Sequence, residues 1–347
     1  MSRWGVILAG GIGSRFWPLS TAARPKQLLP LVDSEPLLVN TLRRLAPIIP
    51  PEQTLVLTAE PLRKAIAAAA PDVPANNIIA EPRPVGTAGA LAWAAVEINR
   101  RHGEDAVMIC VHSDWAIGDD NAFRESLLAA ERVAIEERAL VTVGVVPTRG
   151  DPGFGYIQPG KATESGALKV LRFVEKPTRE RAEHMLHDGY LWNSGIFVWR
   201  VGDFLSEIRA LTPEVSRALA EAGDGTDGGA RFFDAVTPVS VDVGVLERSA
   251  RVRVLPGDFG WDDVGTWGAL RRVKAEDETG NVSSGRVFAV DAVGNVVHAE
   301  EGSVVLYGVS DLVVVTKAGI TLVTTTERSA DLKALVESLP EELRDPT

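Results

Sequence analysis

Residues 6–27 read VILAGGIGSRFWPLSTAARPKQ, and this stretch decides the fold of the chain. Its apolar start is long enough for one buried strand and too short for a helix. Three glycines follow within residues 10–13, where the backbone can turn sharply and approach a ligand closely. Arg15 and Lys26 add positive charge to the same loop. A strand, a turn of exposed N–H groups and two cations together predict a site for a nucleoside triphosphate.

Other glycine loops fit this stretch less well. A Walker A loop needs Lys-Ser or Lys-Thr directly after its last glycine, whereas Gly13 is followed by Ser14-Arg15. A dinucleotide-binding loop needs a third glycine where this chain has Phe16. An ordinary turn between a strand and a helix needs neither three glycines nor two cations.

The composition of the 347 residues limits the class of protein. A hydrophobic content of 45% is ample for one large core and a smaller domain. A formal net charge of −11 disfavours nucleic acid and anionic membranes as partners. The single cysteine, Cys110, allows no intramolecular disulfide. Neither a signal segment nor an apolar run of membrane-spanning length is recognised, so we expect a cytoplasmic protein.

Apolar strands alternate with amphipathic helices along the first two thirds of the chain. We expect strands at 54–58, 78–80, 106–111 and 140–146, and helices at 36–46, 60–70, 86–101, 120–137 and 201–221. This alternation predicts parallel βαβ units and a Rossmann-like, mostly parallel α/β sheet. Ligands of such sheets bind at the carboxyl ends of the strands.

The pattern changes beyond Gly280. Short β runs are expected at 286–290, 295–299, 303–307, 312–316 and 320–324, followed by a helix at about 328–339. They predict a small all-β domain, barrel-like or left-handed β-helix-like, that serves packing, oligomerisation or lid support. We therefore expect an α/β domain over 1–275 and a β domain over 280–347, and we interpret the glycine-rich residues 223–229 as a surface linker.

Three further places in the sequence hold candidate functional residues. Asp114 follows the apolar strand at 106–111, where a carboxylate suits Mg²⁺ bound to substrate phosphates. Cys110 and His112 share one face of that strand and could form a nucleophile pair, although a buried strand cysteine is the commoner case. Thr87 could cap the helix that begins near Gly86.

The opening stretch resembles the signature of the sugar-1-phosphate nucleotidyltransferases. Its Phe-Trp-Pro-Leu-Ser ending and Pro25-Lys26-Gln27 are similar to the mannose-1-phosphate guanylyltransferase branch. Later motifs match in order, namely Phe173-Val174-Glu175-Lys176-Pro177, Trp192-Asn193-Ser194-Gly195-Ile196-Phe197, Ser240-Val241-Asp242 and Gly260-Trp261-Asp262-Asp263-Val264-Gly265. The chain departs from the family pattern before Thr87, where Arg-Asn is missing, and at Trp115 and Phe154, which replace His and Tyr.

The resemblance implies a role for each motif residue. It implies catalytic cations at Arg15, Lys26 and Lys176; nucleotide binding by Leu8, Ala9, Gly10, Gly11, Gly13, Thr87 and Asp114; sugar-phosphate binding by Gly155, Glu175, Lys176, Asn193 and Asp242; and Mg²⁺ held by Asp114 and Asp263.

The implied activity is transfer of GMP from GTP to α-D-mannose 1-phosphate, which gives GDP-mannose and pyrophosphate. The same reaction with another NTP or sugar 1-phosphate stays open, as does a regulatory subunit that senses a nucleotide sugar without turning it over. A nicotinamide oxidoreductase is disfavoured by Phe16. The base, the sugar and the oligomeric state, for which a homodimer is one option, are not fixed by the sequence.

Overall fold

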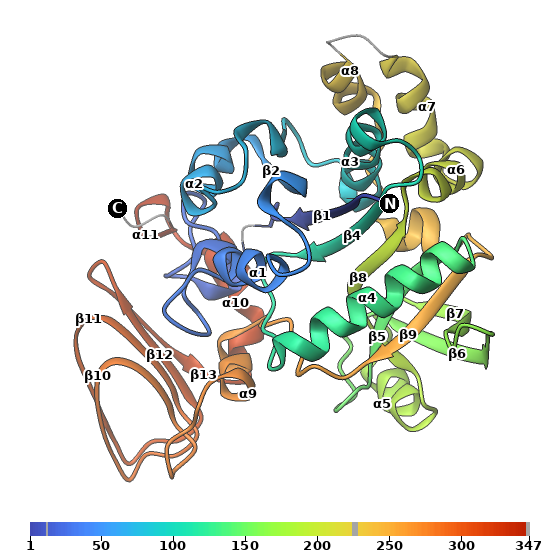
Figure 1. The fold of residues 1–347 in the computed structure, drawn as a ribbon. Coiled ribbons are helices and arrows are strands. Elements are labelled where there is room, and N and C mark those ends of the chain that lie inside the picture. Colours follow the sequence, from blue (N-terminus) through green and yellow to red (C-terminus); the bar gives the residue numbers. More distant parts are fainter. Residues whose placement is uncertain (12, 224–227, 345–347) are drawn as a thin grey trace.

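The computed structural model describes residues 1–11, 13–223 and 228–344 (Figure 1). Its first part is built on a nine-stranded sheet with the strand order β3-β2-β1-β4-β8-β5-β9-β7-β6. The strands are β1 (Arg3–Leu8), β2 (Thr54–Ala59), β3 (Ile78–Glu81), β4 (Val107–His112), β5 (Leu140–Val145), β6 (Tyr156–Ala162), β7 (Leu168–Val174), β8 (Leu191–Arg200) and β9 (Val252–Gly257).

Most strands of the sheet run in one direction, as the sequence predicted, but β7 and β8 run the other way and make the sheet mixed. Strands β1, β2, β3 and β4 are parallel, but β8 lies antiparallel between β4 and β5. A strand buried on both faces reads as a continuous apolar run, from which its direction cannot be told. The reversal brings the amino end of β8 to the sheet edge at which β4 and β5 end. The pairing of β6 with β8 as well as β7 then closes this half of the sheet on itself.

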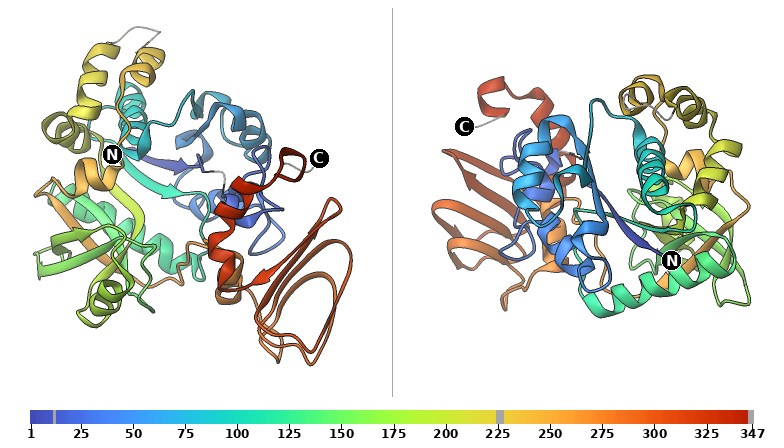
Figure 2. Two further views of the ribbon diagram at one scale, coloured as in Figure 1. Left: turned by 180° about the vertical axis from the view of Figure 1, so that it is seen from behind. Right: turned by 45° about the horizontal axis from the view of Figure 1, so that its top comes forward.

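Helices cover both faces of the sheet (Figures 1 and 2). One face packs against α3 (Gly86–His102), α6 (Val201–Leu211), α7 (Pro213–Ala222) and α8 (Gly228–Ala235), and the other against α1 (Leu37–Leu45), α2 (Arg63–Ala69), α4 (Asp120–Glu136) and α5 (Arg179–His187). Strand β1 shows the cause, because Val6 and Leu8 enter the first core and Ile7 enters the second. Successive strand side chains point to opposite faces, so a strand in this position must be apolar throughout.

The C-terminal part is a four-stranded sheet that coils on itself. Its strands are β10 (Val282–Val290), β11 (Val296–Tyr307), β12 (Leu312–Lys317) and β13 (Ile320–Thr325); the first three are parallel, and β13 is antiparallel to β12. The buried Asn295 amide donates to Asn281 Oδ1 at 2.9 Å, and Asn295 Oδ1 accepts the Leu312 N–H at 2.9 Å. These amides tie successive turns of the coil together, which confirms a β-helix-like all-β part.

Several expected elements differ in detail. The helix expected at 201–221 is divided into α6 and α7 before Pro213, since proline lacks an N–H and disfavours a helical residue before it. The runs at 295–299 and 303–307 form the single strand β11. The last expected helix begins as a 3-10 turn over Arg328–Asp331 and continues as α10 (Leu332–Ser338); the short helices α9 (Leu270–Val273) and α11 (Glu341–Arg344) were not expected.

The residues that follow the glycine loop anchor the C-terminal part. Phe16, Trp17 and Leu19 share one apolar cluster with Val313 and Leu322, which belong to β12 and β13. Phe16 therefore has a packing role at the position that excludes a dinucleotide loop. The two sheets follow one another along the chain, while the domain limits near 275–280 stay a prediction.

Parts of two earlier expectations lie outside the described residues. Ile12 of the glycine loop and residues 224–227 of the expected linker are among them, and Gly228 and Gly229 open helix α8 instead of ending a linker. Of the helices that the structure describes, none is long and apolar enough to cross a membrane. The cytoplasmic location stays a prediction.

Candidate active site

Two adjoining cavities lie where β1, β2, β3 and β4 end and β8 begins. The first cavity has a volume of about 310 Å³, and its polar wall includes Gly10, Gly11, Glu81, Ser113 and Asp114. The second has a volume of about 320 Å³, and its wall includes Gly155, Glu175, Lys176, Asn193, Asp242 and Asp263. Thr87 and His112 line both cavities. The site can therefore hold two ligands side by side.

Side chains from later in the chain fix the glycine loop after β1. The carbonyl oxygen of Ala9 accepts hydrogen bonds from Gln27 Nε2 at 2.8 Å and Thr58 Oγ1 at 3.0 Å. The Ser20 hydroxyl donates to the Gly13 carbonyl at 2.8 Å. Ser20 and Gln27 of the signature thus stabilise the conformation of the glycine loop.

Glycine is needed at residue 13 for a different structural reason than at residues 10 and 11. Gly13 has a φ of +70°, and a Cβ there would lie 2.3 Å from Cβ of Lys26, so a side chain would displace the lysine. A Cβ on Gly10 or Gly11 would meet no atom within 4 Å. These two residues leave the floor of the first cavity open and their backbone accessible to a ligand.

Lys26 lies behind the cavity walls and bonds to one wall residue of each cavity. Its side chain is 7% exposed, and Nζ donates to Asp114 Oδ2 at 2.9 Å and to the Asp263 carbonyl oxygen at 2.7 Å. Burial opposes ionisation of Asp114, but the Lys26 ammonium outweighs it and lowers the pKa of that carboxyl below its usual value. The site thus contains a fixed cation between Asp114, a wall residue of the first cavity, and Asp263, a wall residue of the second.

Asp263 does not lie at the end of a strand. It follows the bridge between Ala116 and Asp262, which lies beyond the end of β9. Burial raises its pKa, Lys26 opposes this effect, and the charges of Asp262 and Asp114 add to it. The carboxyl therefore gains from a nearby positive charge, such as a cation or a second basic side chain.

Arg15 lies on the same side of the cleft as Asp263. A Cβ on Gly265 would be 2.5 Å from Asp263 Oδ2 and 3.5 Å from Arg15 Nη1, so both groups border this glycine. Arg15 is exposed, and within residues 1–11, 13–223 and 228–344 no ion pair of its side chain is found. Its guanidinium is available for an anionic ligand.

The residues of the second cavity form one polar network. Asn193 donates its N–H to the Gly155 carbonyl at 2.8 Å and its Nδ2 to Asp242 Oδ1 at 2.7 Å. A Cβ on Gly155 would lie 2.7 Å from Glu175 Oε2, so this glycine makes room for the carboxylate. Burial, and then the Glu175 charge, raise the pKa of Asp242 to about 6. Hydroxyl groups of a sugar suit such a set of acceptors and amide donors.

Lys176 is placed at the rim of the second cavity. It has a φ of +43°, and its Nζ lies 3.1 Å from Glu175 Oε1. The side chain is 69% exposed, which leaves the ammonium free to turn toward a phosphate.

Thr87 has a partner that the sequence did not suggest. Its Oγ1 accepts the N–H of Val241 at 2.8 Å, and helix α3 is preceded by Val85 without a side-chain cap. The interpretation of Thr87 as a helix cap is therefore wrong. Nor does the Cys110–His112 pair provide a nucleophile, because Cys110 is in the core and burial raises the pKa of its thiol well above the ordinary value.

Glu81 is a functional candidate that sequence reasoning missed. It ends β3, lines the first cavity, and makes no ion pair with any residue that the structure describes. Burial raises its pKa to about 7, although a hydrogen bond from the Val85 backbone opposes the shift. Its position at a strand end directly before Pro82 was the signal that could have found it.

Asp114 and Asp263 are the two candidate metal ligands. Among the described residues there is no group of three or more His, Cys, Asp or Glu side chains that could hold a metal ion. Asp114 and Asp263 both contact Lys26, and the raised pKa of Asp263 reflects in part the charge of Asp114. Two carboxylates suffice for Mg²⁺ when substrate phosphates complete its shell, so the donor set fits this ion.

Known protein families match almost the whole chain. Residues 4–280 match the family described as "Nucleotidyl transferase". The chain belongs to this family. Residues 285–339 match the "MannoseP isomerase/GMP-like beta-helix domain". These matches confirm the nucleotidyltransferase family, the enzyme class and the combination of an α/β sheet with an all-β C-terminal part.

Individual relatives narrow the comparison. A protein of Klebsiella pneumoniae named "Mannose-1-phosphate guanylyltransferase" is 38% identical, with 98% of this chain and 74% of the relative aligned. A protein of the same name from Escherichia coli is 37% identical over the same shares. A crystal structure from Thermus thermophilus, described as a "mannose-1-phosphate geranyltransferase", superposes with a TM-score of 0.89 at 35% identity and covers 97% of this chain and 99% of that one.

Proposed function

We propose that this chain transfers GMP from GTP to α-D-mannose 1-phosphate and releases GDP-mannose and pyrophosphate. One observation carries the proposal: Lys26 joins Asp114, on the wall of the first cavity, to Asp263, on the wall of the second. A group transfer needs two ligands held in contact and a fixed positive charge where they meet. The relatives named mannose-1-phosphate guanylyltransferase support the same reaction.

The reaction is an in-line displacement at the α-phosphorus of the nucleotide. A phosphate oxygen of the sugar 1-phosphate attacks, a new P–O bond forms, and the bond to the β-phosphate oxygen breaks as pyrophosphate leaves. The attacking oxygen is already anionic, so no general base is required. Catalysis then consists of positioning and of neutralising charge that moves toward pyrophosphate.

Each cation takes a position that suits one step. Arg15 holds the departing pyrophosphate, Lys26 holds the α-phosphate side of the junction, and Lys176 holds the phosphate of the sugar. Asp114 and Asp263 would hold Mg²⁺, and this ion would supply further neutralisation of phosphate charge. In the second cavity, Glu175, Asn193 and Asp242 orient the sugar through its hydroxyl groups.

Glu81 favours guanine as the base. The walls of the first cavity include the apolar Leu8, Leu57 and Ala90, which suit a flat ring, and Glu81 is an acceptor at its end. A carboxylate accepts two hydrogen bonds side by side, and guanine offers N1–H and the 2-amino group in that arrangement. Uracil and thymine present one N–H between two carbonyl oxygens, which a carboxylate repels.

A pyrophosphate-release assay with a panel of NTPs and sugar 1-phosphates tests the function. We expect GTP with mannose 1-phosphate to give the highest kcat/KM, and ITP, which lacks the 2-amino group, to fall roughly tenfold or more below GTP. Glu81→Gln should narrow the GTP-to-ITP ratio toward one, because the new amide NH₂ opposes one guanine donor. Glu60→Gln, at an exposed position beyond the cavity wall, serves as the matched control.

The panel also distinguishes the alternatives. A higher kcat/KM for UTP or dTTP would refute guanine and keep the reaction class. Tight binding of a nucleotide sugar without turnover on any pair would favour the regulatory subunit. The homodimer stays a prediction, which sedimentation velocity measures.

A further inference from the structure

The first turn of helix α3 is attached to a segment of the chain more than 150 positions away. Gly86 has a φ of +74°, and a Cβ there would lie 2.3 Å from the carbonyl oxygen of Val239. The Ala88 N–H donates to that same oxygen at 3.1 Å, and Thr87 Oγ1 accepts the Val241 N–H at 2.8 Å. Three consecutive residues of the helix thus hold residues 239–241 in close contact.

The attached segment is part of the wall of the second cavity, which Ser240, Val241 and Asp242 line. Asp242 begins a π-helical turn over Asp242–Leu246, and its Oδ1 accepts the hydrogen bond from Asn193 Nδ2 at 2.7 Å. On the other side of the contact, Ala88 and Leu91 are fully buried in the core, so α3 cannot shift without disturbing it. The helix is a rigid reference for the position of the Asp242 carboxylate.

The Thr87 hydroxyl is already committed to this contact. A hydroxyl oxygen can accept a second hydrogen bond and donate one, but the bond from the Val241 N–H ties this hydroxyl to the segment that leads into Asp242. The missing Arg-Asn before Thr87 fits the same arrangement, because any Cβ at residue 86 would collide with the Val239 backbone.

We propose that Thr87 is a positioning residue for the sugar phosphate, which it affects by fixing the backbone before Asp242, and that it is not a binding residue for the nucleotide. The inference rests on the proposed function, since it assigns the second cavity to the sugar 1-phosphate. It differs from the role that the family resemblance implies for Thr87.

Thr87→Val tests this role because it keeps the branched shape and removes the acceptor of the Val241 N–H. We expect KM for the sugar 1-phosphate to rise about tenfold while KM for the NTP changes by less than threefold. Thr87→Ser keeps the acceptor and should restore the sugar KM. Thr41→Val is the matched control, because Thr41 is a buried threonine whose hydroxyl bonds to its own helix, away from the cleft.

Two outcomes would overturn the proposal. One is a Thr87→Val enzyme whose KM rises for the NTP and not for the sugar 1-phosphate, which would make Thr87 a nucleotide contact. The other is a variant with both KM values unchanged. If Thr87→Val fails to fold, Thr87→Ala gives the same comparison with less crowding.

Calorimetry separates this proposal from the proposed function. Wild-type protein is titrated with mannose 1-phosphate and, separately, with GTP, and Thr87→Val is measured in the same way. A wild type that binds neither ligand refutes the function itself. A wild type that binds both, with sugar-phosphate affinity unchanged in Thr87→Val, refutes only the role of Thr87.

Discussion

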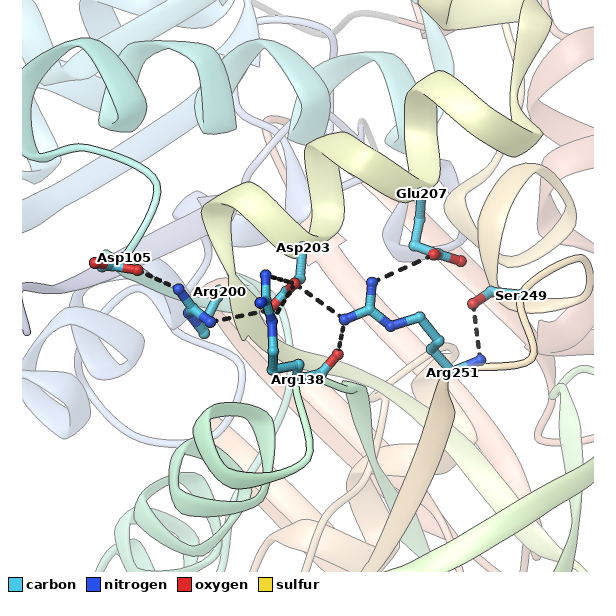
Figure 3. A network of polar contacts seen from close by, with 7 residues as sticks. All are labelled: Asp105, Arg138, Arg200, Asp203, Glu207, Ser249 and Arg251. Carbon is cyan, nitrogen blue, oxygen red and sulfur yellow. Dashed lines mark hydrogen bonds and ion pairs between the residues drawn. The ribbon is translucent and has the colours of Figure 1, made fainter.

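A cluster of charged side chains around a buried one lies at each end of the central strands of the nine-stranded sheet. The two clusters differ in whether their charges are paired within the protein. At the edge where β4 ends, Lys26 lies between Asp114 and Asp263. At the opposite edge, where β4, β5 and β9 begin, Asp203 of α6 is surrounded by Arg138, Arg200 and Arg251 (Figure 3).

The Asp203 cluster is balanced within the protein. Arg138 Nη2 and Arg251 Nη2 each lie 3.0 Å from Asp203 Oδ1, and Arg200 Nη1 lies 3.6 Å from Oδ2. Asp105 pairs with Arg200, and Glu207 pairs with Arg251 at 3.5 Å, so three carboxylates face three guanidinium groups (Figure 3). The Asp203 side chain is 2% exposed. This cluster joins α6 to the starts of three strands, and each of its carboxylates is paired with a guanidinium group of the protein.

The charged groups of the cleft are not balanced in this way. Burial raises the pKa of Glu81, Asp242 and Asp263, while Arg15 and Lys176 remain exposed to solvent. The buried acids are complementary to hydrogen-bond donors of a ligand, and the exposed cations are complementary to its phosphate groups. The same residue types therefore stabilise the fold at one edge and prepare a reaction at the other.

The largest effect should come from the carboxylates that define the cleft. Asp114→Asn and Asp263→Asn preserve shape and each remove a charge, so each should lower kcat roughly 10³-fold or more with the fold retained. The double variant should be little worse than either single one if both act through one ion. Mg²⁺-dependent turnover at the wild-type rate, with only a lowered Tm in either variant, would contradict the shared-metal assignment.

Lys26→Met should lower kcat by roughly 10²- to 10³-fold, because a preorganised positive charge is lost at the junction of the ligands. Pyrophosphate release measures the rate, and thermal unfolding checks the fold. Lys317→Met is the matched control, since Lys317 is another largely buried lysine that contacts Glu300 and the Leu19 carbonyl outside the cleft. A folded Lys26→Met enzyme within tenfold of the wild-type kcat would remove Lys26 from the catalytic set.

The balanced cluster should respond in stability and not in rate. Asp203→Asn leaves three arginines with one buried anion fewer and should reduce the free energy of unfolding by about 3 kcal/mol, with kcat of the folded enzyme unchanged. Urea denaturation and active-site-normalised rates measure the two quantities. Asp105→Asn removes a carboxylate that is 72% exposed and should cost less than about 1 kcal/mol. Equal losses for the two variants would contradict the importance of burial.

The smallest effect is a pH dependence of stability that originates in the cleft. The pKa of Asp242 is raised from 3.8 to about 6, so the folded state holds a proton that the unfolded chain releases at lower pH. Its favourable effect on stability is complete below pH 3.8 and is lost as pH rises through about 6. Relative to Asp242→Asn, the wild type should lose about 2 kcal/mol of unfolding free energy between pH 4 and 7. Urea titrations across this range test the sign, which a rise with pH would contradict.

The sequence alone was informative wherever local rules apply. Strand β1, the glycine loop and the carboxylate after β4 were predictable, because apolar runs and backbone conformations depend on neighbours in the chain. The motif Trp192-Asn193-Ser194-Gly195 could be recognised in the sequence, but its place at the cleft depends on the antiparallel direction of β8, which no local pattern reveals.

What only the tertiary structure decided is which side chains share a partner. Lys26 and Asp114 are 88 positions apart, Thr87 and Val241 are 154 apart, and Arg138 and Asp203 are 65 apart. Sequence reasoning placed Lys26 and Asp114 in one site without predicting their contact, interpreted Thr87 as a cap or a nucleotide contact, and gave no role to Asp203 or Glu81. The physical reason is that the pKa and the hydrogen bonds of a polar group depend on its burial and on its neighbours. Both are set by segments that are distant in the sequence and pack together in the fold.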